Sequence, residues 1–169
     1  MEFISTRGKD GPISFETALL NGLARDGGLY LPVSWPRFNL DEIRQMRGLS
    51  YSDLAGLIMS RFTDGEIDQV EMTSLARQSY ADFTHPDVVS LRPLAENIHI
   101  LELFHGPTIA FKDYAMQFLS RVFDRALTRQ NRTAVILGAT SGDTGSAALE
   151  AFKGRDSVDV FIPVSYTHL

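Results

Sequence analysis

The feature that most constrains this fold is an apolar strand candidate that leads straight into a glycine-rich loop and a helical pattern. Residues 133–137 are nearly all apolar, residues 138–146 contain three glycines and four hydroxyl side chains, and residues 144–153 read as a helix. Continuous apolar strands are typical of a parallel sheet covered on both faces. Ligands of such sheets bind beyond the carboxyl ends of the strands. The pattern therefore predicts an α/β sheet with a ligand loop at residues 138–146.

The second half of the chain repeats this alternation. A strand is expected at residues 98–103, a helix at 113–128 and a further strand at 158–162, which gives the order βαβαβ. Crossover connections in such units are right-handed. The order predicts the start of a three-layer α/β domain.

The first half has a different character, with short helices between Gly and Pro residues. Helices are expected from Ser14 as cap to residue 24, from a Ser50 and Asp53 capping pair to residue 62, and over residues 66–83. Asp26-Gly27-Gly28 reads as a turn before an extended piece at 29–32. The breaker Thr84-His85-Pro86 and the pair Arg92-Pro93 are expected to frame an extended linker. We therefore expect a small, mostly helical domain at residues 1–90 and the α/β domain at residues 91–169.

Composition narrows the classes of partner. The net charge of −5 comes without a dense basic cluster, so neither nucleic acid nor an anionic membrane surface is expected as a partner. The chain has no cysteine and its four histidines lack metal-ligand spacing, which predicts no metal site. No signal peptide and no apolar run of roughly 20 residues is present. We expect a cytoplasmic protein that acts on a small molecule.

The segment 104–113, Phe-His-Gly-Pro-Thr-Ile-Ala-Phe-Lys-Asp, delivers Lys112 to the start of a helix. A lone lysine there is usually a solvated side chain. However, a cation is poorly placed at a helix N-terminus, and the apolar neighbours Ile109, Ala110 and Phe111 favour a neutral amine by desolvation. A neutral amine is what Schiff-base chemistry requires. Lys112 is therefore either a surface residue or a candidate nucleophile.

The polar neighbours of Lys112 have simpler interpretations. His105, next to Gly-Pro, is expected to hydrogen-bond within its own loop, with a catalytic role as the alternative. Asp113 is expected to be a first-turn partner of the helix dipole and not an acid catalyst.

The loop at residues 138–146 predicts an anion site, because helix N-terminal N–H groups attract carboxylate or phosphate. A plain strand-to-helix turn with hydroxyl caps explains the same residues. The glycines fall as G-x-x-x-G-x-x-G, which matches neither the Walker A nor the dinucleotide pattern. A nucleotide-binding module is therefore disfavoured.

Three segments together resemble the threonine synthase family of pyridoxal-phosphate enzymes, which is related to the serine/threonine dehydratases and to tryptophan synthase β. They are Ile-Ser-Thr-Arg-Gly at residues 4–8 with the block 14–30, then residues 103–113, and then residues 138–147. The resemblance covers nearly the whole chain to about residue 162. The N-terminal block separates it from the dehydratases.

The resemblance implies conversion of O-phospho-L-homoserine and water to L-threonine and phosphate, with pyridoxal 5′-phosphate as cofactor. Lys112 would hold the cofactor and act as the catalytic lysine. The substrate carboxylate and the cofactor ring would face the loop residues Thr140, Ser141, Gly142, Asp143 and Thr144, of which Asp143 would also contact the cofactor. Arg7 is a candidate for a substrate phosphate, with a plain surface arginine as the alternative.

The resemblance also has gaps. Family members are longer, so the chain is expected to be a truncated, inactive N-terminal piece. The end of the chain, residues 163–169, departs from the family pattern and reads as an artefact of truncation or sequencing. A threonine-synthase-like phospholyase or dehydratase that gives 2-oxobutyrate and ammonia remains an alternative, as does a non-catalytic anion-binding piece. The sequence leaves the oligomeric state open.

Overall fold

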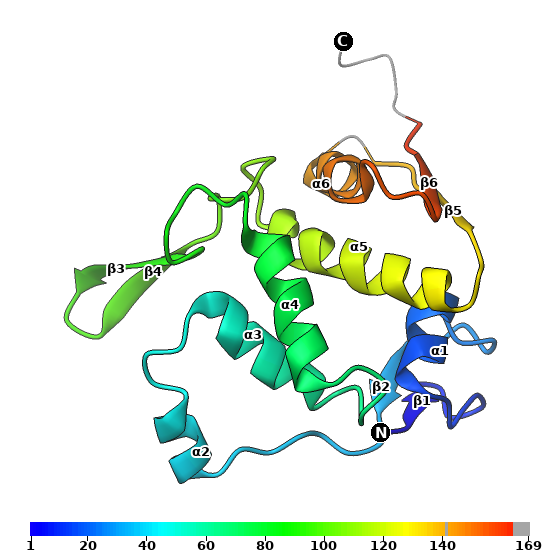
Figure 1. The fold of residues 1–169 in the computed structure, drawn as a ribbon, viewed down its shortest axis with the longest axis horizontal. Coiled ribbons are helices and arrows are strands. Elements are labelled where there is room, and N and C mark those ends of the chain that lie inside the picture. Colours follow the sequence, from blue (N-terminus) through cyan, green and yellow to red (C-terminus); the bar gives the residue numbers. More distant parts are fainter. Residues whose placement is uncertain (141, 164–169) are drawn as a thin grey trace. The chain divides into compact units, whose positions relative to one another are not determined.

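A computed structural model describes residues 1–140 and 142–163 (Figure 1). The helices are α1 Phe15–Asn21, α2 Leu40–Gln45, α3 Tyr51–Ser60, α4 Gln69–Tyr80, α5 Lys112–Arg129 and α6 Asp143–Phe152. The strands are β1 Phe3–Ser5, β2 Tyr30–Pro32, β3 Ser90–Ala95, β4 Ile98–Glu102, β5 Ala134–Leu137 and β6 Val158–Phe161. The chain divides into an N-terminal unit, residues 1–76, and a C-terminal unit, residues 77–169. A domain boundary after residue 90 stays a prediction.

An antiparallel pair of short strands lies in the N-terminal unit. β1 pairs with β2 so that Phe3 lies opposite Pro32. The turn before β2 requires Gly28, because a Cβ there would lie 2.1 Å from the Ser5 Oγ. The extended piece expected at residues 29–32 is thus a strand. Its partner β1, only three residues long, gives too short a pattern to be predicted.

Side-chain caps start two of the helices where the sequence predicts them. The Ser14 Oγ accepts a hydrogen bond from the Thr17 N–H at 3.3 Å before α1, and the Ser50 Oγ accepts one from the Asp53 N–H at 3.2 Å before α3. α1 is shorter than predicted, because Gly22 leaves the helix with a φ of +68°.

The helix α2 is absent from the sequence prediction. The Asn39 Oδ1 accepts hydrogen bonds from the N–H groups of Asp41 and Glu42, both at 2.9 Å, and the Glu42 side chain accepts one from the Asn39 N–H at 2.8 Å. This capping box is readable in the sequence as Asn-x-x-Glu. The helix is short and has no buried residue, so an apolar stripe could not indicate it.

The core of the N-terminal unit forms around α3 and the first part of α4. Ile67, Met72 and Ala76 are at most 1% exposed. The helices approach closely at Gly56, where a Cβ would lie 2.2 Å from the Thr73 Oγ1. The mostly helical character expected for this part is confirmed, although α4 is shorter than the predicted helix over 66–83.

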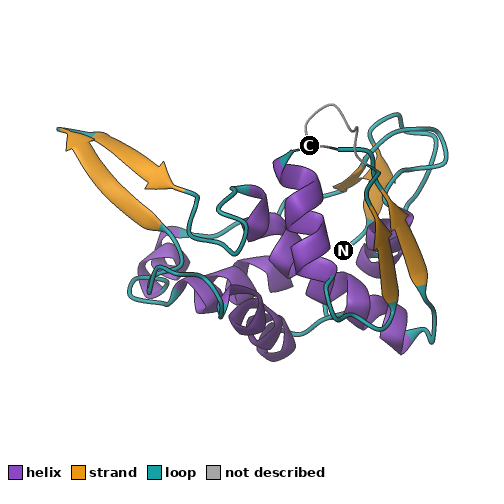
Figure 2. Ribbon diagram, turned by 90° about the horizontal axis from the view of Figure 1, so that it is seen from above, coloured by secondary structure: helices purple, strands orange, loops and turns teal. Residues whose placement is uncertain are grey.

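The C-terminal unit contains an antiparallel hairpin where the sequence pattern predicts a strand of a parallel sheet. β3 and β4 pair antiparallel and project from the helices of this unit (Figures 1 and 2). The prediction that residues 98–103 open a parallel βαβαβ sheet is therefore wrong for the described residues. The two-residue loop Glu96-Asn97, with Asn97 at a φ of +63°, closes a tight hairpin. Arg92-Pro93 lies within β3 and is not a linker.

The other two strands form the predicted parallel unit. β5 pairs in parallel with β6, with Ala134 opposite Val158 and Leu137 opposite Phe161, and α6 makes the crossover. α5 packs on α6. Exposure alternates along β5, and Val135 is 65% exposed. The mixed α/β class is confirmed, but only one face of this strand pair is covered within the described residues.

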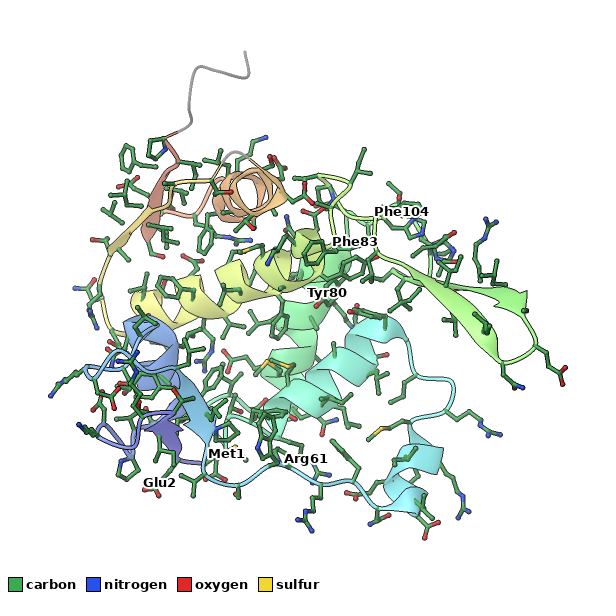
Figure 3. The ribbon with its side chains drawn as sticks, turned by 180° about the vertical axis from the view of Figure 1, so that it is seen from behind. Met1, Glu2, Arg61, Tyr80, Phe83 and Phe104 are labelled. Carbon is green, nitrogen blue, oxygen red and sulfur yellow. The ribbon has the colours of Figure 1, made fainter. Side chains whose placement is uncertain are left out.

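An aromatic cluster lies at the start of the C-terminal unit. Tyr80 and Phe83, labelled in Figure 3, have ring centroids 5.4 Å apart. The ring centroids of Phe83 and Tyr114 are 4.8 Å apart. The Tyr114 hydroxyl donates to the Val88 carbonyl at 2.9 Å. These contacts tie the segment before the hairpin to the first turn of α5. Within the described ranges, every helix is too short or too polar to cross a bilayer.

Candidate active site

Lys112 is the first residue of α5. This residue is half-buried, and its Nζ lies 5.0 Å from the centroid of the Phe111 ring. It makes no ion pair with another described residue. Ala110 is buried, but Ile109 and Phe111 are exposed, so the apolar neighbours named in the sequence enclose the amine only in part. The neutral, nucleophilic amine stays a prediction.

Asp113 organises the loop that precedes Lys112. The Asp113 side chain is fully buried. Its carboxylate accepts hydrogen bonds from the Thr108 N–H at 2.8 Å and the Thr108 hydroxyl at 2.7 Å, with a longer one from the Ala110 N–H at 3.5 Å. Asp113 does stand in the first turn of α5, as expected. The binding of this carboxylate to the loop was not expected from the sequence.

Two backbone features show how tightly this loop is folded. A Cβ on Gly106 would lie 2.4 Å from the Asp113 Cβ, so only glycine fits there. Ile109 has a φ of +61°, a conformation that costs a β-branched residue free energy. The His-Gly-Pro-Thr run was the available sequence signal for an unusual loop.

His105 contacts its own segment. Its Nε2 lies 3.2 Å from a Glu102 carboxylate oxygen, and its ring centroid lies 4.9 Å from that of His85. The Glu102 carboxylate also faces Arg92, with the Arg92 Nε at 3.4 Å. These contacts fit the interpretation of His105 as a residue that hydrogen-bonds locally.

The glycine-rich loop follows β5 and ends at the start of α6. Gly142 is the N-cap, and no described side chain caps this helix. The Gly145 N–H of the first turn donates to the Gly142 carbonyl at 3.1 Å, which leaves the N–H groups of Asp143 and Thr144 for an external acceptor. Packing around Gly145 is close, since a Cβ there would lie 3.0 Å from the Thr140 carbonyl oxygen. Gly142 and Asp143 are exposed and Thr140 and Thr144 are half-buried, whereas Ser141 lies outside the described residues.

That Lys112 and the glycine-rich loop form one site stays a prediction. No hydrogen bond or ion pair between described residues joins Lys112 to Thr140, Asp143 or Thr144. No group of three or more described acidic or histidine side chains could hold a metal ion.

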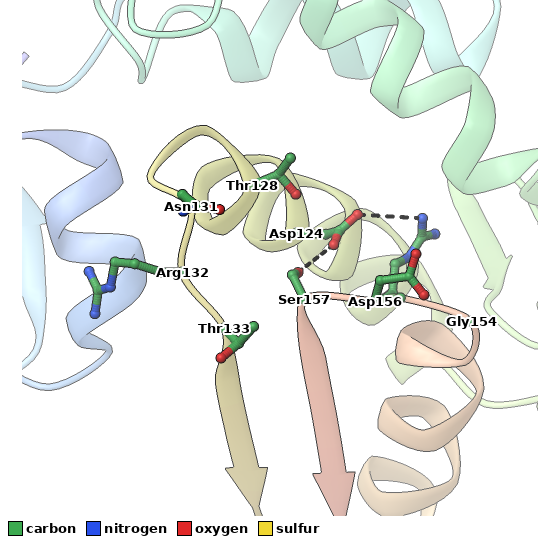
Figure 4. Close-up of a pocket in the computed structure, with 9 residues that line it drawn as sticks. Asp124, Thr128, Asn131, Arg132, Thr133, Gly154, Asp156 and Ser157 are labelled. Carbon is green, nitrogen blue, oxygen red and sulfur yellow. Dashed lines mark hydrogen bonds and ion pairs between the residues drawn. The ribbon is translucent and has the colours of Figure 1, made fainter.

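A separate cleft lies at the opposite, amino-terminal edge of the β5–β6 pair (Figure 4). Its volume is about 390 Å³, and it is lined by polar residues at the end of α5 and before the two strands: Asp124, Thr128, Asn131, Arg132, Thr133, Gly154, Arg155, Asp156 and Ser157. The Ser157 hydroxyl donates to Asp124, and the Arg155 Nη1 lies 4.0 Å from the same carboxylate. These contacts fasten the start of β6 to α5.

The N-terminal motif is joined by hydrogen bonds within its own unit. The Asp26 carboxylate accepts from the Ser5 hydroxyl at 2.6 Å, the Gly28 N–H at 2.9 Å and the Lys9 N–H at 3.0 Å. The hydrogen bond from Ser5 is the main reason that the pKa of Asp26 lies below its ordinary value. Arg7 is exposed, and its Nη1 donates a hydrogen bond to the Asp26 carbonyl at 3.0 Å. This guanidinium N–H group therefore has a partner within the protein and needs no bound ligand.

Comparisons with known proteins agree with this combination of features. The family model "Threonine synthase N terminus" matches residues 2–80. The threonine synthase of Pseudomonas aeruginosa is 49% identical over 96% of this chain and 34% of its own length. The crystal structure of pyridoxal-phosphate-bound threonine synthase from Brucella melitensis superposes with a TM-score of 0.94 at 49% identity, covering 97% of this chain and 35% of that one. The chain belongs to the threonine synthase family.

A relative with a different name also matches this chain. Threonine synthase-like 2 of Rattus norvegicus is 37% identical over 99% of this chain and 35% of its own length. The chain therefore spans about a third of the length of the relatives that it matches.

Proposed function

We propose that this chain is the N-terminal part of a pyridoxal-phosphate-dependent threonine synthase, which converts O-phospho-L-homoserine and water to L-threonine and phosphate. The observation that carries the proposal is Lys112 at the start of α5, in a loop held by Asp113, in a chain 49% identical to a threonine synthase. The sequence resemblance and the fold point the same way.

The residues present fit the cofactor in two respects. Lys112 supplies an amine on a half-buried side chain, free of ion pairs with described residues. The start of α6 supplies exposed glycine backbone at Gly142, where a Cβ would meet open space, and a dipole that favours anions. Lys112 would hold the cofactor, and Asp143 is the proposed contact to it from the second loop.

The proposed mechanism uses these residues for positioning and proton transfer. Pyridoxal phosphate, when bound, supplies an electron sink next to the substrate amino group. The Lys112 Nζ, once free, would move protons at Cα and Cβ of the substrate while phosphate leaves Cγ. The amine is suited to this task because it stands at a fixed helix start and carries no competing ion pair with a described residue.

The glycine-rich loop would bind the substrate carboxylate. Helix N-terminal N–H groups and the hydroxyls of Thr140, Ser141 and Thr144 are the proposed donors. Holding the carboxylate would turn the reacting carbons toward Lys112, which contributes to the rate by orientation.

A phospholyase or dehydratase outcome is the second candidate. The same lysine and anion loop could release 2-oxobutyrate, ammonia and phosphate instead of threonine and phosphate. A non-catalytic anion-binding role is the third. A cytoplasmic location and the absence of nucleic-acid partners stay predictions.

The test uses the full-length gene product, purified with pyridoxal phosphate and given O-phospho-L-homoserine. We expect threonine and phosphate in equal amounts, whereas 2-oxobutyrate would favour the second candidate. Lys112→Ala should abolish both the reaction and the visible absorbance band of lysine-bound cofactor. Lys153→Ala is the matched control, because Lys153 is an exposed lysine that pairs only loosely with Glu150 at 3.8 Å. A band that survives in Lys112→Ala would contradict the proposed role of Lys112.

A further inference from the structure

The side chain next to Lys112 is buried in a way that helix stability alone does not require. An acidic residue in a first turn favours the helix dipole even when it is exposed. Asp113, in contrast, is 0% exposed, and burying a carboxylate is costly unless hydrogen bonds compensate. The hydrogen-bond donors to Asp113 therefore indicate what its burial achieves.

All the hydrogen-bond donors found for the Asp113 carboxylate come from the loop before Lys112. The Thr108 N–H and hydroxyl reach its two oxygens at 2.8 Å and 2.7 Å, and the Ala110 N–H approaches at 3.5 Å. Charge-assisted hydrogen bonds of this length are among the strong ones. The burial of Asp113 is thus compensated only while the loop keeps this conformation.

The loop conformation is one that the chain would not adopt without such restraint. Ile109 has a φ of +61°, which a β-branched residue keeps only where its surroundings enforce it. A Cβ on Gly106 would overlap the Asp113 side chain, so Gly106 and Asp113 are in direct contact. Restraint by Asp113 and strain at Ile109 lie within four residues of Lys112.

We propose that Asp113, acting through Thr108, is a positioning residue that fixes the strained loop of residues 105–111 and thereby sets the place and direction of the Lys112 amine. This inference rests on the proposed function of Lys112. Asp113 touches neither substrate nor reacting atoms in this assignment. It acts on the chemistry only through the backbone that carries Lys112.

A positioning role has a kinetic signature. Substrate binding is assigned to the loop at residues 138–146, so loosening residues 105–111 should leave KM nearly unchanged and lower kcat. The rate at which Lys112 bonds with added cofactor should fall as well, because misplacing a reacting group by about 1 Å can cost about 100-fold.

The experiment uses two substitutions at Thr108 in the full-length gene product. Thr108→Val keeps the shape but removes the hydroxyl donor to Asp113, whereas Thr108→Ser keeps that donor. Asp87→Asn, at an exposed aspartate of the same unit, is the matched control. For each protein stripped of cofactor, we would measure the rate of appearance of the visible band after adding pyridoxal phosphate, then kcat and KM, and the urea unfolding midpoint.

We expect Thr108→Val to slow band formation and to lower kcat by about tenfold or more, the size of one lost hydrogen bond to a charged group, with KM changed less than about threefold. Thr108→Ser and Asp87→Asn should match the wild type. Asp113→Asn, which replaces one acceptor by a donor, should resemble Thr108→Val.

Band formation and kcat at wild-type values in a folded Thr108→Val variant, with the band still lost in Lys112→Ala, would overturn this inference and leave the proposed function standing. A loss in Thr108→Ser equal to that in Thr108→Val would overturn it too, since the hydroxyl would then be irrelevant. A band that persists in Lys112→Ala would overturn the proposed function and this inference together.

Discussion

Single carboxylates fix the loops of both units. Asp26, in the turn before β2, accepts a hydrogen bond from Ser5 of β1. Asp113, in the first turn of α5, accepts one from Thr108 in the loop of residues 105–111. In each case the donors include a neighbouring hydroxyl and backbone N–H groups. These N–H groups have no partner in a helix or sheet, so the aspartate accepts the hydrogen bonds that water would otherwise accept. One short side chain therefore determines the conformation of several residues.

Asp26 allows a prediction about pH. Its pKa lies below the ordinary value of 3.8, chiefly because the Ser5 hydroxyl donates to it. A depressed pKa in the folded state adds stability above pH 3.8, and this contribution is lost as the pH falls through the lower folded value. Asp26→Asn should therefore speed amide exchange in residues 5–28 near neutral pH and make little difference at pH values below the folded pKa of Asp26.

Hydrogen-exchange mass spectrometry of the full-length protein at several pH values would measure this difference. Glu2→Gln is the control, since it removes an exposed carboxylate of the same unit. Equal exchange in wild type and Asp26→Asn at neutral pH would show that the charge of Asp26 adds no stability.

At the residue scale, the sequence predicts the position of Lys112 but not the hydrogen bonds that hold the loop before it. The position of Lys112 at a helix start follows from local sequence, and the structure places it as the first residue of α5. The hydrogen bonds from Thr108 to Asp113 could not be predicted, because they depend on the positive φ of Ile109. That conformation is not favoured by the residue that adopts it.

At the scale of elements, the capped starts of α1 and α3 and the parallel pair β5–β6 were predictable, whereas the capped helix α2 and the antiparallel partner of β4 were not. Ser14 and Ser50 mark helix starts through hydrogen bonds that span three residues. An apolar run such as residues 98–103 reads the same whether its partner is parallel or antiparallel. The partner of β4 depends on the loop Glu96-Asn97, which lies outside the run.

The helix α2 gives a prediction at this scale. It has no buried residue, so its stability depends on the capping box of Asn39 and Glu42 and on the ion pair of Glu42 with Arg61 at 2.8 Å. Asn39→Ala should cost about 0.5–2 kcal/mol of helix stability. Because α2 opens locally, we expect amide protection in residues 41–46 to fall by about 2- to 30-fold, since 1.4 kcal/mol corresponds to a factor of ten.

Exchange measurements on α2 and on α3 in the same sample would separate this effect from global unfolding. Gln45→Ala, at the exposed end of α2, is the control and should leave protection unchanged. A fall in protection that is equal in α2 and α3 would mean that the capping box supports the whole N-terminal unit.

At the scale of the whole molecule, the C-terminal unit exposes apolar surface that its described residues do not cover. Val135, Leu137 and Phe161 on the parallel strand pair are 65%, 76% and 58% exposed. Each of β5 and β6 has one strand partner among the described residues. The relatives are about three times as long as this chain, and we infer that their further residues cover the equivalent surface.

This surface predicts how the 169-residue chain behaves when it is produced alone. Open strand edges beside an exposed apolar face promote association, so we expect soluble aggregates or precipitation where the full-length protein stays in solution. Val135→Lys places a charge on the exposed face without touching the half-buried Ile136, and it should lower the aggregated fraction measured by light scattering after size-exclusion chromatography. The same substitution in the full-length protein should destabilise it, because there the position would be covered. A monomeric wild-type chain that unfolds cooperatively would show instead that the surface needs no cover.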